Sequence, residues 1–385
     1  MTIHTFCRNP LVKGLTCIRC GTSYQEGDFF TGCPACRQSG HPSSLRVDYR
    51  SMLPWDRDGK KPGMMRYGNR LPYTIFPTLG EGNTPLLELP RLADKLGISS
   101  FRMKDEGQNP TGSHKDRFSP LVIARALETD ARVLVTASSG NAGLSVTSYA
   151  AFAGLDCVVI SQENLNKGLQ KAIQGTGAKL LLMNQPHERW ELMHRFVEEE
   201  GYFPVTNYIN PPVGSHPCGV QGYKTIAYEI YEQSGNRAPD AVLVPTSRGD
   251  LLWGIKEGFD ELSRIGLIQR IPRLVAIEPI PRLSEVLVGE DWRKEFTDGH
   301  TPLLSIGGNT VAWQAVSALQ ETEGSAVVVG AEEASAAQEE LEQHGLYLEL
   351  SSATILAAAR QLIQKRWIKP EEYVIAVGTS HGWKL

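Results

Sequence analysis

The stretch GQNPTGSHKDRF, residues 107–118, places a lysine directly after a run of turn-forming residues. Turn signals at 109–110 and 112–113 lead us to expect Lys115 at a junction between a loop and a helix. A lysine held at such a junction suits covalent chemistry better than a lysine on an exposed helix face. The alternative is that Ser113 caps a helix whose first turn carries only surface charges. The stretch alone leaves both interpretations open.

The rest of the chain alternates between short apolar runs and longer helical patterns. Five runs rich in β-branched residues predict buried parallel strands at 133–135, 157–160, 241–244, 274–277 and 373–377. Helical segments are expected in the gaps, for example at 144–153 and 251–265. This alternation predicts an open α/β architecture, in which ligands bind beyond the carboxyl ends of the strands. The 385 residues, 41% of them hydrophobic, suffice for two or three domains.

Composition and charge argue against several classes of partner. The net charge of −4 gives no basic footprint for nucleic acid. No apolar run approaches the roughly 18 residues that indicate a membrane span. Residues 1–16 lack the apolar segment and cleavage site of a secretory signal, so we expect a cytoplasmic protein.

Four cysteines near the start of the chain form two Cys-x-x-Cys pairs, Cys17 with Cys20 and Cys33 with Cys36. Two such turns facing each other supply the four thiolates that structural zinc prefers. Disulfide bonds are the alternative, which a reducing cytoplasm disfavours. A site with four protein ligands has no open position, so we expect this Zn²⁺ to be structural. Cys7 lies outside the pattern, and its role is left open.

Polar turns of small residues follow three of the expected strands, at 136–141, 245–250 and 378–382. In the second turn, Gly249 and small neighbours let backbone N–H groups approach an anion, and the helix that follows offers its positive end. This turn is a candidate phosphate site. Any strand-to-helix turn favours the same residue types, so one such turn alone decides nothing.

A reactive lysine, a phosphate-binding turn and a polar turn for a ring together match pyridoxal 5′-phosphate, an aldehyde cofactor with a phosphate group. The sequence resembles the threonine synthase branch of the fold-type-II pyridoxal-phosphate enzymes. The motifs that carry the resemblance are EGNTPL (81–86), KDE (104–106) with KDR (115–117), SSGN (138–141), SSAT (351–354) and TSHG (379–382). They run in the family's order along nearly the whole chain, and the cysteine ribbon resembles the same enzymes.

The resemblance implies a fold with an N-terminal zinc ribbon and two open α/β domains. The expected boundaries are 1–45 for the ribbon, 46–108 together with 211–385 for a larger, discontinuous, cofactor-binding domain, and 109–210 for a smaller domain with the asparagine loop. It also makes a homodimer an assembly to consider.

The resemblance also assigns roles to individual residues. It implies cofactor binding by Lys115, His114, Asn141, Thr246, Ser247, Arg248, Gly249, Asp250, Leu251 and Thr379, and substrate binding by Ser138, Ser139 and Asn141. Lys115 would form the Schiff base with the cofactor and then move the substrate's α-proton. Residues 246–251 would receive the cofactor phosphate. Thr379 would face the pyridine nitrogen with a hydroxyl, which favours elimination and replacement over transamination.

Two departures from the family pattern bear on the substrate. Gly219 falls where these enzymes carry an arginine that grips the phosphate of O-phosphohomoserine, and Ala142 falls where a threonine commonly follows the loop asparagine. A bidentate arginine contact to phosphate is among the stronger polar interactions, so its loss weakens selection for a phosphorylated substrate. His114 stands where threonine synthases usually carry phenylalanine.

We therefore expect a pyridoxal-phosphate-dependent β- or γ-elimination or replacement enzyme. Its substrate is expected to be a small amino acid with a leaving group that is not a phosphate. Threonine synthase itself is one alternative. A catalytically silent protein, which binds the cofactor or uses its zinc ribbon for an interaction, is another.

Overall fold

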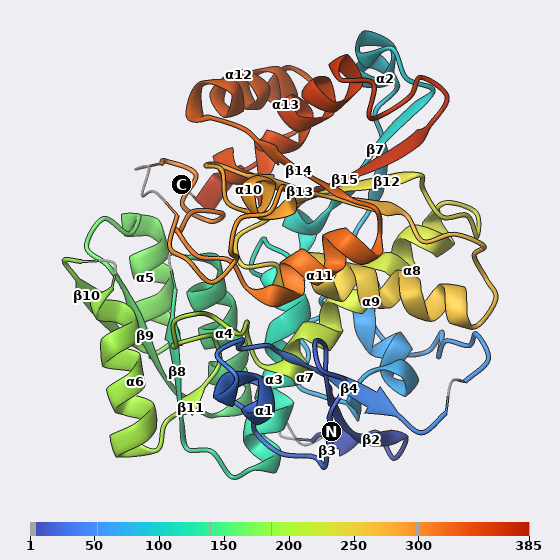
Figure 1. Ribbon diagram of the computed structural model, residues 1–385. Coiled ribbons are helices and arrows are strands. Elements are labelled where there is room, and N and C mark those ends of the chain that lie inside the picture. Colours follow the sequence, from blue (N-terminus) through green and yellow to red (C-terminus); the bar gives the residue numbers. More distant parts are fainter. Residues whose placement is uncertain (1–4, 52, 139, 186, 297–300, 385) are drawn as a thin grey trace. The chain divides into compact units, whose positions relative to one another are not determined.

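The computed structural model describes residues 5–51, 53–138, 140–185, 187–296 and 301–384 (Figure 1). Two compact units divide the chain. The first comprises the described parts of Met1–Gly82 and Asn109–Thr225, and the second comprises Asn83–Gln108 and the described part of Ile226–Lys384. These units do not test the predicted division into a ribbon, a smaller domain and a larger domain, which stays a prediction. Within the described residues, no helix is long and apolar enough to cross a membrane.

The paired cysteines lie on a small antiparallel sheet in the first unit. Its strand order is β3 (Ser23–Tyr24), β2 (Val12–Cys17) and β4 (Leu45–Tyr49), and the short helix α1 (Pro34–Gln38) follows β3. Apolar residues of β2 and β4, including Leu15 and Val47, pack in one core with Met64 and Met65. The ribbon thus packs against the rest of the first unit.

Further short elements connect the ribbon to the rest of the first unit. They are β1 (Cys7–Arg8), the 3-10 helix η1 (Gly63–Arg70) and β5 (Tyr73–Ile75), with β1 and β5 paired antiparallel.

A four-stranded parallel sheet forms the α/β part of the first unit. Its strand order is β10 (Lys179–Met183), β9 (Asp156–Gln162), β8 (Val133–Ala137) and β11 (Phe203–Pro204). Val135 and Ile160 pack with Met193 of α6 (Glu188–Glu200) on one face. Val159, whose side chain alternates to the other face, meets Gly143 of α4 (Asn141–Ala153). Helix α5 (Lys167–Gly175) lies between β9 and β10 in the sequence.

Helix α3 (Lys115–Glu128) packs against α4 and against two short segments, α7 (Pro217–Val220) and the 3-10 helix η3 (Gln221–Tyr223). The approach to η3 is close. A Cβ added to Gly222 would lie 1.8 Å from the carbonyl oxygen of Arg117. Only glycine allows the two backbones to meet at this point.

The second unit is built on a six-stranded sheet. Its strand order is β14 (Ser325–Val328), β13 (Arg273–Glu278), β12 (Ala241–Pro245), β15 (Tyr373–Gly378), β7 (Ser100–Asp105) and β6 (Leu86–Glu88). All neighbours are parallel except the antiparallel pair β6 and β7. The five predicted strands, two in the first unit and three in the second, are therefore confirmed, and each pairs with its neighbours in parallel.

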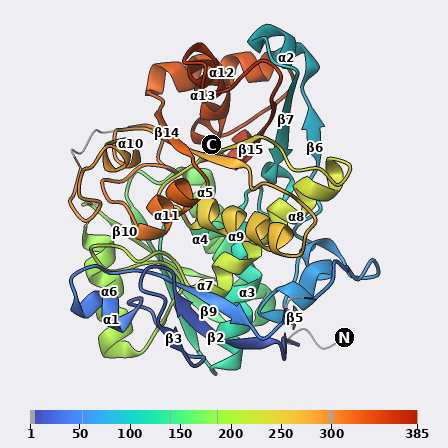
Figure 2. The same ribbon diagram turned by 45° about the vertical axis from the view of Figure 1, so that its right-hand side comes forward.

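Helices cover both faces of this sheet. Figures 1 and 2 show α2 (Pro90–Leu96), α12 (Ala331–Gln343) and α13 (Leu350–Gln364) on one side, and α8 (Lys224–Gln233), α9 (Asp250–Arg264) and α11 (Trp313–Glu321) on the other. The remaining helical segments are η2 (Glu106–Gln108), α10 (Leu283–Leu287) and η4 (Gly382–Lys384). A core shared by α2, α12, α13 and the strands fills the first of these faces.

Candidate active site

Lys115 is the first residue of α3, so the predicted junction between loop and helix is confirmed. His114 precedes the helix, and no side chain caps it. Asp116 and Arg117 are fully buried, which makes the alternative of a capped helix with surface charges wrong. Lys115 itself is half-buried, with its Nζ 5.9 Å from the centre of the Tyr223 ring.

A buried carboxylate fixes the start of the lysine helix. Asp116 accepts hydrogen bonds from the backbone N–H and the hydroxyl of Thr111, both at 2.6 Å. It also accepts one from the hydroxyl of Ser145 on α4, at 2.6 Å. The Ser145 oxygen lies 2.7 Å from that of Ser119, one turn further along α3. The residue after Lys115 therefore joins the turn, the lysine helix and the helix that begins at Asn141.

Glu81, from the motif EGNTPL, makes a second connection to α4. Its carboxylate accepts a hydrogen bond of 2.7 Å from the Tyr149 hydroxyl and others from Thr78 and the N–H of Leu79. Burial raises the pKa of Glu81 to about 7, although these donors act in the opposite direction. A carboxyl group with this pKa changes its charge near neutral pH.

The asparagine loop is held by the hydroxyl of Ser138, which is buried. This oxygen accepts hydrogen bonds from the N–H groups of Gly140, at 3.1 Å, and Gly143, at 2.8 Å. Asn141 follows as the first residue of α4 and is half-buried. Ser139 lies outside the described residues. The structure thus brings Ser138 and Asn141 to one end of α4, the helix that Asp116 joins to Lys115.

Position 219 is enclosed by an aromatic ring. A Cβ added to Gly219 on α7 would lie 2.3 Å from Cε2 of Phe118, which is buried on α3. Phe118 stacks on Tyr223, with ring centres 6.1 Å apart, and the centre of the His114 ring lies 5.7 Å from that of Tyr223. The ring of Phe118 therefore fills the space that a side chain at position 219 would need.

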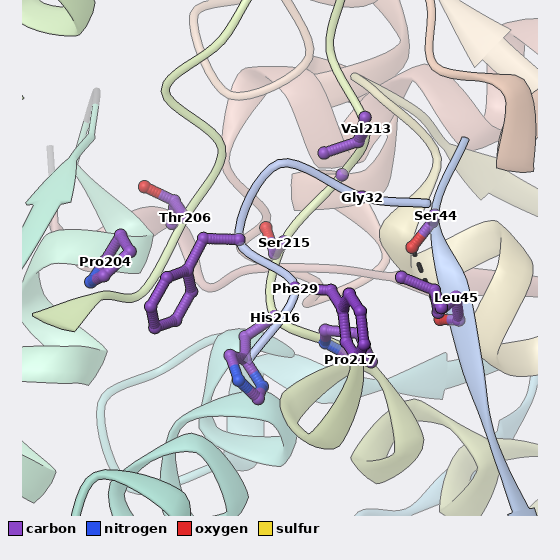
Figure 3. Close-up of a pocket in the computed structure, with 12 residues that line it drawn as sticks. Phe29, Gly32, Ser44, Leu45, Pro204, Thr206, Val213, Ser215, His216 and Pro217 are labelled. Carbon is purple, nitrogen blue, oxygen red and sulfur yellow. Dashed lines mark hydrogen bonds between the residues drawn. The ribbon is translucent and has the colours of Figure 1, made fainter. Parts of the chain in front are cut away.

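The segment before α7 contacts the cysteine ribbon. His216 Nε2 lies 3.2 Å from a carboxylate oxygen of Asp28, and its Nδ1 accepts the N–H of Cys218. Arg125 of α3 donates to the same oxygen of Asp28, at 2.8 Å. Figure 3 shows the chain that carries Phe29 and Gly32 beside the chain that carries Val213, Ser215 and His216. Asp28 therefore braces the lysine helix and α7 against the ribbon.

The four predicted zinc ligands lie together. One sulfur atom from each of Cys17, Cys20, Cys33 and Cys36 lies within 4.8 Å of the other three. The Cys17–Cys36 and Cys20–Cys33 sulfur separations are 3.6 and 3.7 Å, so neither pair is a disulfide. A tetrahedron with metal–sulfur bonds of about 2.3 Å has edges of about 3.8 Å. The cluster is compatible with a zinc ion.

In the second unit, the predicted phosphate turn lies between β12 and α9. Thr246 is buried and its hydroxyl donates to Val244, while the Ser247 hydroxyl donates to the carbonyl of Gly307 at 3.1 Å. Gly249 precedes α9 with a φ of 92°. A Cβ added there would lie 2.4 Å from Cβ of Ala315, so the turn depends on glycine.

Three further residues of this turn begin or precede α9. Arg248 has its carbonyl 3.4 Å from Nε2 of Gln314, Asp250 accepts a hydrogen bond of 2.5 Å from the same amide, and Leu251 is buried. The helix has 15 residues, and its N-terminal N–H groups point to the turn, as an anion site requires.

The turn after β15 lies at the same edge of the sheet, because β12 and β15 are parallel neighbours. Thr379 is buried, and its N–H donates to the hydroxyl of Ser352 at 2.6 Å. Ser352 belongs to the motif SSAT, so this motif holds the final turn in place. The predicted cofactor residues of the second unit, Thr246 to Leu251 and Thr379, therefore share one edge.

The sequence did not reveal the roles of Asp116 and Phe118, which lie on the lysine helix, or of Arg282 in the second unit. Arg282 is fully buried and donates to the carbonyls of Thr246, Ile306 and Gly308. Asp116 stands inside a quoted motif, and its position beside the lysine was the available signal. Neither Arg282 nor Phe118 carries a local pattern that reveals its role, because their partners lie far away in the sequence.

Comparison with known proteins identifies the family. Residues 77–380 match the model of the pyridoxal-phosphate-dependent enzymes. The threonine synthase of Methanosarcina acetivorans is 29% identical over 381 residues, which cover 95% of this chain and 91% of that protein. The threonine synthase of Halalkalibacterium halodurans is 31% identical over 319 residues, covering 81% and 85%.

Solved structures agree on the fold. A processed threonine deaminase isoform from Solanum lycopersicum matches with a TM-score of 0.66 and 21% identity, over 77% of this chain and 79% of that one. A fungal L-serine ammonia-lyase from Rhizomucor miehei matches with a TM-score of 0.65 and 21% identity, over 77% and 93%. The chain is an enzyme of the pyridoxal-phosphate-dependent family, with the fold-type-II architecture and threonine synthases among its relatives.

Proposed function

We propose that the enzyme carries out β- or γ-elimination or replacement on an amino acid whose leaving group is uncharged. The observation that carries this proposal is the ring of Phe118 in the space where a side chain at Gly219 would begin. Tyr223 and Phe118 offer aromatic carbon near Lys115, where a phosphorylated substrate requires cationic donors. An unpaired buried charge costs several kcal/mol, which corresponds to about a thousandfold in affinity.

The residues present fit pyridoxal phosphate. The hydroxyl of Ser113, two residues before Lys115, is buried without a hydrogen-bond partner among the described residues. Gly249 leaves bare backbone at the N-terminus of α9, where a Cβ would close the turn. Both features suit a phosphate-bearing ligand, because each offers hydrogen-bond donors to an anion.

The cofactor, when bound, withdraws electrons from the substrate's α-carbon. We assign Lys115 the covalent bond to the cofactor and the transfer of the α-proton. Asn141, with Ser138 and Ser139, holds the cofactor's ring oxygen and the substrate carboxylate. The turn from Thr246 to Leu251, with His114, holds the phosphate. Thr379 offers a neutral hydroxyl to the ring nitrogen, which disfavours protonation there and thereby favours elimination and replacement over transamination.

Threonine synthase is a second candidate, because the relatives that align with nearly the whole chain carry that name. The two candidate functions predict different activities with O-phosphohomoserine. We expect its kcat/KM to lie about a thousandfold below that of the best substrate among serine, threonine, O-acetylserine and O-acetylhomoserine. Efficient, saturable conversion of O-phosphohomoserine to threonine by the unaltered enzyme would overturn the proposal.

A pair of variants tests the role of Phe118. Gly219→Arg alone forces the new side chain into the Phe118 ring, so we expect lower stability and no gain with the phosphorylated substrate. Gly219→Arg combined with Phe118→Ala removes the obstruction and supplies a guanidinium. The double variant is expected to improve kcat/KM for O-phosphohomoserine at least tenfold over Phe118→Ala alone. An equal value in both variants contradicts the assignment.

We also assign one structural Zn²⁺ to Cys17, Cys20, Cys33 and Cys36. The sulfur separations near 3.7 Å support this assignment. Metal analysis of protein prepared under reducing conditions is expected to give one zinc per chain, and Cys20→Ser with Cys33→Ser is expected to lose it. A zinc-free protein with an intact ribbon would contradict the assignment.

A further inference from the structure

A cleft of about 430 Å³ lies in the second unit, at the amino ends of β7 and β15. Tyr373, the first residue of β15, lines it, whereas Thr379 follows the other end of the same strand. With a rise of about 3.3 Å per residue, the two ends are about 17 Å apart. The volume falls within the range of small-molecule sites. This cleft is therefore distinct from the candidate active site.

Two guanidinium groups of the cleft lie over the same aromatic ring. The Cζ atom of Arg102 lies 5.0 Å from the centre of the Tyr373 ring, and that of Arg237 lies 5.1 Å from it. The two positive groups are therefore no more than about 10 Å apart. Stacking on tyrosine leaves the edges of a guanidinium, which carry its N–H donors, open to an acceptor. Both groups line the cleft.

Both arginines retain N–H donors that have no acceptor within the described ranges. No hydrogen bond or ion pair of Arg237 occurs among the residues that the structure describes. Arg102 donates one long hydrogen bond, from Nη1 to the Tyr373 hydroxyl at 3.3 Å, and its buried Nε has no acceptor in the described part of the chain. Arg102 does pair with Glu88 at 2.5 Å, but Glu88 is 68% exposed. An exposed ion pair contributes little, so an incoming anion can replace Glu88 at small cost.

The remaining wall indicates what the rest of a ligand could contact. The hydroxyl of Ser234, 2.6 Å from that of Tyr373, adds a neutral polar group. Leu89 and Ala93 add apolar surface. A bare phosphate fills only a small part of this volume, so the cleft suits a small molecule that carries one anionic group and an uncharged remainder.

We propose that this cleft binds a small organic anion, through a carboxylate or phosphate group held by Arg102 and Arg237. The proposal is independent of the reaction assigned above. Guanidinium groups bind both kinds of anion in a bidentate manner, so the two sources share one chemistry.

Calorimetric titration of the enzyme with its cofactor bound tests the proposal. Inorganic phosphate and succinate serve as separate probes, at constant ionic strength in chloride buffer. We expect saturable binding of at least one probe without change in the visible absorption of the cofactor. Tighter binding of phosphate points to a phosphorylated ligand, and tighter binding of succinate points to a carboxylate.

Variants locate the binding. Arg237→Gln and Arg102→Gln are each expected to raise the Kd about tenfold, as the loss of a charge-assisted hydrogen bond predicts. Arg264→Gln, which removes an exposed arginine of α9, serves as the matched control and is expected to change the Kd less than twofold. The proposal is wrong if neither probe binds, or if binding survives both cleft substitutions unchanged.

Discussion

The lysine segment of the first unit and the cofactor turns of the second unit are held in different ways. Around Lys115, hydrogen bonds between side chains predominate: Asp116 accepts from the hydroxyls of Thr111 and Ser145, and Glu81 accepts from the hydroxyl of Tyr149. In the second unit, side chains hold the backbone itself, since Arg282 and Ser352 bind main-chain groups of the turns.

This contrast has a physical consequence. A charged network fails when one partner is removed, because the remaining polar groups stay buried without partners. A turn defined by its backbone fails when the chain can no longer adopt its shape. The first unit should therefore respond to changes of charge, and the second to changes of shape.

The largest effect is expected from Lys115→Ala, which removes the only group in the lysine segment that we assign to covalent chemistry. We expect kcat to fall at least a thousandfold, since a general acid or base alone contributes up to about 10⁴. The visible absorption of the lysine-bound cofactor should disappear as well. Borohydride reduction of the unaltered enzyme should attach the cofactor to the Lys115 peptide, and attachment at another lysine refutes the assignment.

Asp116→Asn tests the charged network without changing its size. The new amide keeps one acceptor oxygen but replaces the other with an NH2 group, so at least one of the hydrogen bonds that the carboxylate accepted is lost and a donor there faces a donor. We expect the free energy of unfolding to fall by about 4 kcal/mol, measured by urea denaturation. The exposed Asp156→Asn in the same unit is the control and should lie within about 0.5 kcal/mol of the unaltered protein. Equal stability of the two variants shows that the network does not hold the helix.

Gly249→Ala tests the dependence of the second unit on shape. Gly249 and Gly266 both have positive φ values, 92° and 77°, but only Gly249 has a neighbour that a Cβ would strike. Gly266→Ala should cost about 1 kcal/mol of strain, and Gly249→Ala about 3 kcal/mol because the contact with Ala315 adds to it. The excess should also appear as weaker binding of pyridoxal phosphate, measured by dialysis and absorbance. Equal losses in the two variants mean that the turn relaxes.

The sequence predicts the parts of both regions that depend on local pattern. Runs such as 241–244 and 373–377 are buried on both faces, so their apolar character identifies them as strands without further information. The short edge strand β6 has no such run. Three-residue β6 pairs antiparallel with β7, and no local pattern indicates that pairing.

The supporting contacts are harder to predict. Asp116 looks like a surface charge until Ser145 is known to face it, 29 residues later. Phe118 meets Gly219, about a hundred residues away, and Arg282 binds carbonyls on two separate loops. These contacts depend on packing between distant segments, so they follow from the fold and not from any single motif.

The smallest effect that we expect is a pH dependence of stability caused by Glu81. It tests the contrast between the two units, because Glu81 titrates among the buried polar side chains of the first unit. The pKa of Glu81 is raised from 4.5 to about 7 in the folded protein, so the folded state holds its proton more tightly than the unfolded state. Stability should therefore fall as the pH rises from about 4.5 to about 7, by on the order of 2 kcal/mol, and this contribution should level off above pH 7. Glu81→Gln stays neutral and should lack this decline, while the exposed Glu199→Gln should retain it. Urea denaturation at pH 5, 6, 7 and 8 measures the difference between the two variants. A difference that does not change with pH means that Glu81 keeps its charge when buried, held by Tyr149 and Thr78 more strongly than burial opposes it.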